Sequence, residues 1–146
     1  MEQKKRLATG DRPTGKLHIG HYVGSIENRV RLQDEYDCYF FIVDLHMLTT
    51  KKEKADIIAS RDHIKEMMID YLSCGIDPAK STIYLQSVIP AIYELNLFFE
   101  MLVNVNRLHA LPSIKEMAKN AKMDIEAVPF GLLGYFSYKG SCCSCR

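Results

Sequence analysis

Short apolar runs recur along the chain and predict three strands, at residues 6–9, 38–43 and 82–85. The middle run is apolar at every one of its six positions, which is typical of a central parallel strand buried on both faces. Glycine and proline follow the first run at Gly10, Pro13 and Gly15, so a loop is expected there.

Between these runs, apolar residues recur with helical spacing. They predict helices over residues 19–36, 54–74, 90–103 and 114–123. The apolar stripe of the first helix begins at Ile19, Tyr22 and Val23, and that of the second consists of Ile57, Ile58, Ile64, Met67, Met68, Tyr71 and Leu72. Gly75 and Pro78 are expected to end the second helix, and Pro90 suits the first turn of the third.

The order strand, helix, strand, helix, strand predicts a parallel sheet with right-handed crossovers. We therefore expect the α/β class, as a partial Rossmann-like nucleotide-binding fold in which helices flank a parallel sheet. The sequence contains neither an internal repeat nor a low-complexity linker.

Composition narrows the class of protein. Of the 146 residues, 47% are hydrophobic and 25% charged, which excludes disorder driven by a charge-rich composition. With a net charge of +1, the protein as a whole does not attract a polyanion. Binding of a nucleic acid would therefore need a local patch of positive charge on the surface. No apolar run approaches the ~18 residues of a membrane helix, and no apolar stretch follows the charged start, so a cytoplasmic protein is expected.

The five cysteines fall into two groups. Cys38 and Cys74 stand in apolar surroundings, as free core thiols usually do. Cys142, Cys143 and Cys145 crowd the last five residues with no histidine near them, which favours neither a zinc site nor a disulfide scaffold. We expect a solvated tail with reactive thiols.

Residues 12–21, Arg-Pro-Thr-Gly-Lys-Leu-His-Ile-Gly-His, carry the chemistry. They lie between the first strand and the first helix, where parallel sheets bind ligands outside the carboxyl ends of their strands. A helix N-terminus offers unpaired N–H groups to a phosphate, and Gly20 allows a flat ring to approach the backbone. His18 and His21 are three residues apart, which places both imidazoles on one side of the first turn.

Two imidazoles at this place can donate hydrogen bonds to phosphate oxygens on which charge develops during nucleotidyl transfer. A histidine pair exposed at the surface and a pair of metal ligands are the alternatives. Zinc usually takes a third protein ligand, and the sequence identifies none. The segment therefore favours a nucleotide site without a protein-bound metal.

Residues 13–21 resemble the first signature of the class I aminoacyl-tRNA synthetases, His-Ile-Gly-His in its short form. Further segments resemble the tryptophanyl-tRNA synthetase family in the same order along the chain, so that the match covers residues 6–135. They are 24–28, 32–33, 39–46, 75–78, Leu85-Gln86-Ser87 with Pro90, and 131–135.

The resemblance implies a ligase that joins tryptophan to ATP, with magnesium assisting as part of the ATP complex, and then transfers the aminoacyl group to tRNA. It implies that His18 and His21 stabilise the reacting phosphates and that Gly20 lies under the adenine. The implied ATP-site residues are Arg12, Pro13, Thr14, Gly20 and His21. The implied amino-acid pocket contains Val43, His46 and Tyr135. The family forms homodimers.

Each implied pocket residue has a simpler alternative. Val43 and Tyr135 suit core packing, and His46 suits a cap at the end of a strand. Arg12 and His21 stand where many tryptophanyl enzymes have Gln and Asn, so a tyrosyl-tRNA synthetase is the alternative substrate class.

The family continues past Tyr135 with Pro-Val-x-Gln-Ala-Ala-Asp and carries a second signature, Lys-Met-Ser-Lys-Ser; both are absent from this sequence. We expect residues 1–135 to be a truncated catalytic domain and residues 136–146 a cysteine-rich tail foreign to the family. Codons for the tail, shifted by one base, can spell Val-Thr-Arg-Ala-Ala-Ala, so out-of-frame translation is one hypothesis. A non-catalytic remnant that binds ATP is the alternative to an enzyme.

Overall fold

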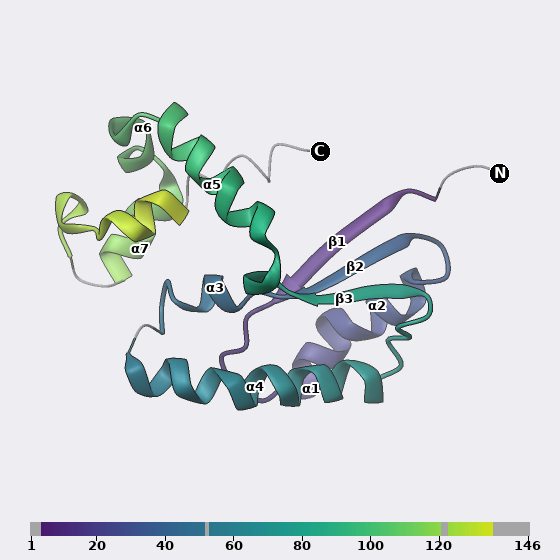
Figure 1. The fold of residues 1–146 in the computed structure, drawn as a ribbon. Coiled ribbons are helices and arrows are strands. Elements are labelled where there is room, and N and C mark those ends of the chain that lie inside the picture. The colour runs from purple at the N-terminus through teal and green to yellow at the C-terminus, as the bar shows by residue number, and fades with distance from the viewer. Residues whose placement is uncertain (1–3, 52, 121–122, 136–146) are drawn as a thin grey trace. The chain divides into compact units, whose positions relative to one another are not determined.

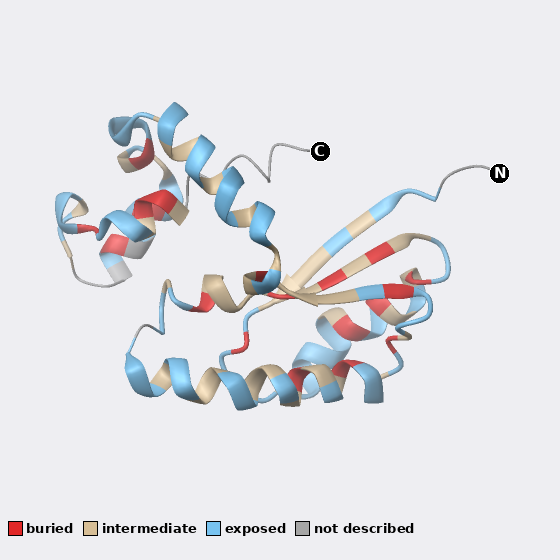
Figure 2. Ribbon diagram, viewed as in Figure 1, coloured by how far each residue is buried: buried red, intermediate tan, exposed pale blue. Residues whose placement is uncertain are grey.

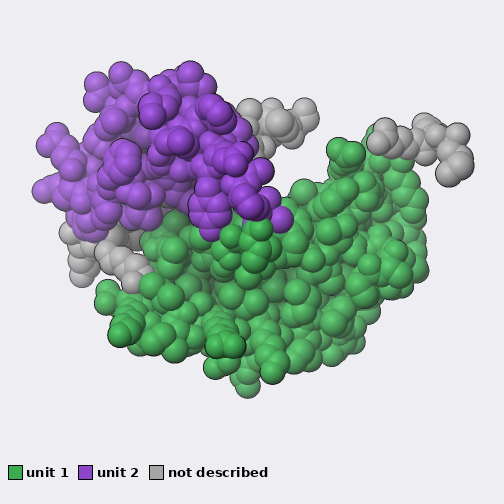
Figure 3. Space-filling view, viewed as in Figure 1, with its two compact units in different colours: residues 1–88 green, residues 89–146 purple. Residues whose placement is uncertain are grey.

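The computed structural model describes residues 4–51, 53–120 and 123–135 (Figure 1). The chain divides into two compact units, Met1–Val88 and Ile89–Arg146 (Figure 3). The predicted division at residue 135 stays a prediction, because the tail at 136–146 lies outside the described residues.

A three-stranded parallel sheet forms the centre of the first unit. Its order is β1 (Arg6–Asp11), β2 (Asp37–Ile42) and β3 (Ser81–Leu85). These are the three strands that the apolar runs predict, with bounds that differ by one or two residues. The carboxyl ends of all three strands therefore point toward the same edge of the sheet.

The central strand β2 buries one face completely. Cys38, Phe40 and Ile42 have no exposed surface and belong to the core cluster, and the residues between them are half-buried. The expectation of a strand fully buried on both faces is therefore wrong for β2. On the less buried face, the ring of Phe41 stacks on that of Tyr84 with centroids 5.3 Å apart.

Helical crossovers join the strands, as the alternating pattern predicts. The first crossover contains α1 (Ile19–His21), the π-helix η1 (Tyr22–Ile26) and α2 (Glu27–Leu32), and the second contains α4 (Lys54–Ser73). Figure 1 shows α1, α2 and α4 on the same face of the sheet. Ile26, Met67, Tyr71 and Ile76 from these crossovers complete the core of the unit. Figure 2 shows buried segments in β2 and in the helices on this face of the sheet. The expected α/β class with a parallel sheet is confirmed.

Two short elements at the strand ends were not predicted. They are α3 (Asp44–Met47), after β2, and the 3-10 helix η2 (Gln86–Val88), after β3. Each covers about one helical turn, which is too short to produce a periodic apolar stripe.

Helix α4 buries only part of its predicted stripe. Met67 and Tyr71 are buried, but Ile57 and Ile58 are 48% and 65% exposed, and Leu72 is 45% exposed. A 20-residue helix is about 30 Å long, whereas a six-residue strand is about 20 Å long. The first half of α4 therefore extends past the strands, which accounts for the exposure of Ile57 and Ile58. The predicted stripe faces the core in the second half, where Ile64 and Met68 pack against the core cluster that contains Met67 and Tyr71, and Leu72 lies at its exposed margin.

The first crossover also departs from a simple stripe. Ile19 and Val23 are 76% and 63% exposed, whereas Ile26 is buried and Val30 packs against the core. The exposed Val23 and the buried Ile26 both lie within the π-helix, Tyr22–Ile26. Its wider turn changes the helical phase, so Ile19 and Val23 leave the face that Ile26 and Val30 bury.

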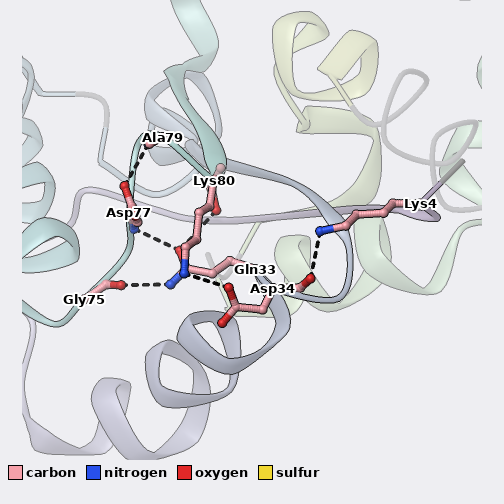
Figure 4. A network of polar contacts seen from close by, with 8 residues as sticks. Lys4, Gln33, Asp34, Gly75, Asp77, Ala79 and Lys80 are labelled. Atoms are coloured by element: carbon pink, nitrogen blue, oxygen red, sulfur yellow. Dashed lines mark hydrogen bonds and ion pairs between the residues drawn. The ribbon is translucent and has the colours of Figure 1, made fainter. Parts of the chain in front are cut away.

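A network of polar contacts centred on Gln33 fixes the turn between α4 and β3 (Figure 4). The Gln33 side chain donates from Nε2 to the Gly75 carbonyl (3.0 Å) and accepts at Oε1 from the Asp77 backbone N–H (2.9 Å). Gly75 has a φ of +102°, a left-handed conformation that ends α4 as predicted. Beside this buried amide, Lys80 and Asp34 form an exposed ion pair at 2.7 Å.

The described residues of the second unit are mainly helical. Its elements are α5 (Pro90–Leu102), α6 (Val105–His109), α7 (Pro112–Asn120), the 3-10 helix η3 (Ile125–Ala127) and helical residues at 130–135. Pro90 occupies the first turn of α5, as predicted. A separate core of this unit is formed by Leu108, Ile114, Ala118, Val128 and Leu133. Between the helices predicted at residues 90–103 and 114–123, the structure contains a five-residue helix, α6, that was not predicted. Asn104 caps its start.

Within the described ranges, no helix combines the length and the apolar character needed to cross a membrane. Cys38 is a buried free thiol and Cys74 a half-buried one, in agreement with the predicted core positions. Cys142, Cys143 and Cys145 lie outside the described residues.

Candidate functional site

A cavity of about 310 Å³ opens at the carboxyl end of β1. It is lined by Asp11, Arg12, Thr14, Gly15, Lys16, Leu17 and His21. The backbone N–H of Val43, just past β2, donates to the carbonyl of Asp11 at 2.9 Å and holds the two strand ends together. The structure thus places a cavity at the sheet edge where the sequence predicts a ligand.

His18 and His21 cap the start of α1 reciprocally. Nδ1 of His18 accepts the backbone N–H of Gly20 at 3.1 Å, and Nδ1 of His21 accepts the backbone N–H of His18 at 3.3 Å. The two ring centroids lie 4.0 Å apart. The predicted placement of both imidazoles on one side of the turn is confirmed.

This capping selects a tautomer. Because both Nδ1 atoms accept hydrogen bonds, the proton of each neutral ring resides on Nε2. The Nε2–H groups of His18 and His21 are therefore set to donate to an acceptor such as a phosphate oxygen. Donors fixed in advance by the backbone need no rearrangement when charge develops on that acceptor.

Gly20 has a packing role that sequence reasoning missed. A Cβ at this position would lie 2.9 Å from Cε1 and 3.0 Å from Nδ1 of His18, closer than ordinary van der Waals contact. The missing side chain allows His18 to fold back over the turn. The implied position of Gly20 under an adenine stays a prediction.

Some of the loop residues before the histidines are buried in the protein, and others are exposed and line the cavity. The backbone N–H of Thr14 donates to the carbonyl of Arg12 at 2.8 Å, a tight turn around Pro13. Pro13 is buried, whereas the exposed Arg12 and Thr14 line the cavity together with His21. Lys16, which sequence reasoning did not single out, also lines it and lies 3.5 Å from Glu66 of α4.

An ionic cluster beneath the loop was also missed. We call it the Asp11 cluster; it consists of Asp11 at the end of β1, Arg29 on α2 and Tyr71 on α4. Arg29 donates from Nη1 to Oδ2 of Asp11 (2.7 Å) and from Nη2 to Oδ1 (3.0 Å), and the Tyr71 hydroxyl donates to Oδ2 at 2.6 Å. The sequence does indicate that Arg29 is buried. Arg29 lies three positions after Ile26 and directly before Val30, so it falls on the side of its helix that these apolar residues bury.

Burial and partners change the acid–base properties of this cluster. Burial, followed by the hydrogen bond to Asp11, raises the pKa of Tyr71 well above its ordinary value. Burial acts to lower the pKa of Arg29, but the hydrogen bond to Asp11 and the electrostatic interactions with Tyr71 and Asp11 outweigh it and raise that pKa. Tyr71 therefore remains a neutral donor and Arg29 a cation over the working range of an enzyme.

The residues of the implied amino-acid pocket fall in both units. Val43 is the half-buried residue just before α3 and not a fully buried strand residue, and His46 lies within α3. Tyr135 belongs to the helical residues 130–135 of the second unit. The carboxylate of Asp44 accepts the backbone N–H of Ser87 at 3.0 Å, which joins α3 to η2. The roles of Val43, His46 and Tyr135 stay predictions.

Among the residues that the structure describes, no group of three or more His, Cys, Asp or Glu side chains is placed to hold a metal ion. Of the described residues that line the cavity, Asp11 alone carries a carboxylate, and both of its oxygens are bonded to Arg29 and one also to Tyr71. Magnesium as part of the ATP complex stays a prediction.

Comparison with known proteins identifies relatives over most of the chain. Residues 1–137 match the family described as tRNA synthetases class I (W and Y). The chain is 58% identical to the tryptophan–tRNA ligase of Chlamydia caviae over 137 residues, and 53% identical to that of Borreliella burgdorferi over 133 residues. These matches cover 92% and 91% of this chain but 40% and 37% of the two relatives, so it spans about two-fifths of their length.

A solved structure shows the same fold. The crystal structure of tryptophanyl-tRNA synthetase from Campylobacter jejuni complexed with ADP and tryptophan aligns with a TM-score of 0.77 at 29% identity. The alignment covers 94% of this chain and 41% of that one. The α/β architecture and the order of its elements are therefore those of that larger protein.

Proposed function

The chain belongs to the class I tRNA synthetases of the W and Y family, and from that membership we propose that it carries the ATP-binding part of a cytoplasmic tryptophan–tRNA ligase. The proposed reaction joins the carboxylate of tryptophan to the α-phosphate of ATP and releases pyrophosphate. The aminoacyl group then passes from the adenylate to tRNA, and AMP is released. Because the chain spans about two-fifths of its relatives, the complete activity, the tRNA and a homodimeric state all belong to this proposal.

The imidazole pair carries the proposal. Capping by the backbone leaves Nε2–H of His18 and of His21 as donors. His21 lines the cavity of about 310 Å³, whereas His18 is not among its lining residues and lies against His21, with ring centroids 4.0 Å apart. Arg12 and Lys16 bring positive charge to the same cavity, which suits a polyphosphate. We assign the triphosphate to this cavity, with Thr14 as a further hydrogen-bonding group and Gly20 beneath the adenine.

Tryptophan is the proposed amino acid because the two relatives at 58% and 53% identity are both tryptophan–tRNA ligases. Val43 and His46, at the carboxyl end of β2, are proposed to contact it, and Tyr135 is proposed to complete the pocket. Tyrosine is the competing substrate, since the matching family includes both specificities.

ATP binding by the 146-residue chain is the first test. Titration calorimetry with MgATP should show binding, and replacing His21 with alanine should weaken it. His63→Ala on α4 removes the same side chain outside the cavity lining and serves as the control. Absence of ATP binding, or equal binding by His21→Ala and the parent, would contradict the assignment of this cavity.

Amino-acid-dependent exchange of pyrophosphate into ATP tests the chemistry. Losing one preorganised donor should slow exchange on the order of 100-fold in His21→Ala. The chain contains no tryptophan, so the indole fluorescence of added tryptophan reports its binding without a background from protein indoles. Exchange with tyrosine alone would identify the tyrosyl specificity, and ATP binding without any exchange would identify a non-catalytic remnant.

A further inference from the structure

The candidate phosphate cavity contains an acidic residue. Asp11 lines it beside Arg12, Lys16 and His21, and 26% of its side chain is accessible. A carboxylate and a polyphosphate repel each other when they share a cavity, and the repulsion is strong where water is scarce. A cavity for ATP therefore has to neutralise Asp11.

Arg29 provides that neutralisation from the buried side. Its side chain is only 5% accessible, and its two terminal nitrogens bond separate oxygens of Asp11 at 2.7 and 3.0 Å. A fork of this kind fixes the plane of the carboxylate as well as its charge. The guanidinium also lies 5.8 Å from the ring centroid of Phe40 and 5.6 Å from that of Tyr71, so aromatic rings of the core hold it in place.

Tyr71 completes the arrangement. Its hydroxyl donates to Oδ2 of Asp11 at 2.6 Å and accepts from Nη1 of Arg29 at 3.0 Å. The three side chains come from β1, α2 and α4. Nη2 of Arg29 also donates to Oγ1 of Thr9 on β1 at 3.5 Å, which is a second contact between α2 and β1. The cluster thus ties the residue from which the cavity loop starts to both helices beneath it.

We propose that Arg29 and Tyr71 are positioning residues for ATP, which neutralise and orient Asp11 so that the loop after β1 accepts a polyphosphate. This inference rests on the proposed ATP-binding function. Neither side chain is among the cavity-lining residues, and both act through Asp11. A role in stability alone is the competing explanation, because breaking a buried ion pair also destabilises the folded state.

The two explanations differ in what happens to ATP affinity in folded protein. Arg29→Met removes the cation and leaves the Asp11 carboxylate uncompensated, so MgATP binding should weaken at least about tenfold. The double variant Asp11→Asn/Arg29→Met removes the repelling charge as well and should recover most of the lost affinity. A purely structural role predicts no such recovery.

Two milder variants allow the same test if Arg29→Met folds poorly. Arg29→Lys retains the positive charge but loses the bidentate contact with the Asp11 carboxylate, and Tyr71→Phe removes only the hydroxyl. Tyr39→Phe is the matched control, because its hydroxyl bonds the carboxylate of Asp37 at 3.2 Å, at the opposite end of β2. Lys80→Met is the control for loss of a cation, since its ion pair with Asp34 is exposed.

The experiment titrates MgATP into each 146-residue variant at a temperature where circular dichroism shows the folded state. We expect weaker binding for Arg29→Met, Arg29→Lys and Tyr71→Phe, recovery in the double variant and no change in either control. Parent-like ATP affinity in folded Arg29→Lys and Tyr71→Phe, or no recovery in a folded double variant, would overturn the inference alone. No binding by the parent would overturn it together with the proposed function.

Discussion

Replacing Gly10 with alanine should destabilise the first unit, whereas the same change at Gly24 should not. Gly10 lies in β1 opposite Phe41 of β2. A Cβ at Gly10 would run into the carbonyl oxygen of Phe41, and it would lie 2.6 Å from Cδ2 and 2.9 Å from Cε2 of the ring. The carbonyl is backbone, so a change of rotamer does not relieve the contact and β1 has to move.

The magnitude follows from two opposing effects. Overpacking of this kind costs about 1–3 kcal/mol, and the reduced entropy of the unfolded chain returns about 0.4–1 kcal/mol. The net loss of about 1 kcal/mol lowers the melting temperature of a small domain by roughly 5 °C. Gly24 is an exposed residue of the π-helix η1, and nothing lies within 4 Å of a Cβ added there, so alanine should stabilise by about 0.5–1 kcal/mol.

The assay is thermal unfolding of the parent, Gly10→Ala and Gly24→Ala, followed by circular dichroism at equal protein concentration. The two variants differ from the parent by the same methyl group, so a difference in sign isolates the contact with Phe41. Gly10→Ala should also bind ATP more weakly, because Asp11 follows it directly. A melting temperature of Gly10→Ala equal to or above that of the parent would refute the reasoning.

Two further predictions concern buried polar groups. Gln33→Ala should lower the free energy of unfolding by about 1–3 kcal/mol in urea titrations, because the Asp77 N–H and the Gly75 carbonyl lose their shared partner; an unchanged midpoint would contradict this. The raised pKa of Tyr71 predicts that its contribution to stability is complete below the ordinary tyrosine pKa of about 10 and is lost as pH rises from there toward the folded-state pKa. The difference in unfolding free energy between the parent and Tyr71→Phe should therefore shrink with rising alkalinity, and a difference that grows would show the opposite shift.

The alternation of apolar runs and helical stripes was sufficient to predict the strands and the longer helices. Local periodicity does not specify how far a helix extends past the sheet it covers, which is why Ile57 and Ile58 are exposed despite their spacing. The phase change at η1 is equally invisible, since a π-helical turn leaves no periodic signature in five residues. Short elements such as α3 and α6 were missed for the same reason.

The candidate site was predicted unevenly. The pairing of His18 with His21 follows from their separation by three residues, but their capping bonds depend on backbone geometry and fix the tautomer. The Asp11 cluster joins residues 18 and 60 positions apart from Asp11, and only the folded sheet brings them together. A single sequence supplies no rule for such long-range ionic contacts.

The segments that relate this chain to the tRNA synthetases have two different physical roles. Gln33 and the turn at Gly75 and Asp77 belong to separate segments of the resemblance, yet they meet in one buried network outside the cavity lining. Their agreement with the family indicates a shared fold, because these contacts connect α2, α4 and β3. Arg12 and His21 line the cavity, and His21 also caps the start of α1 by accepting the backbone N–H of His18. Substitutions at these two positions therefore test the activity in protein whose folding has been verified, whereas substitutions at Gln33 test the scaffold.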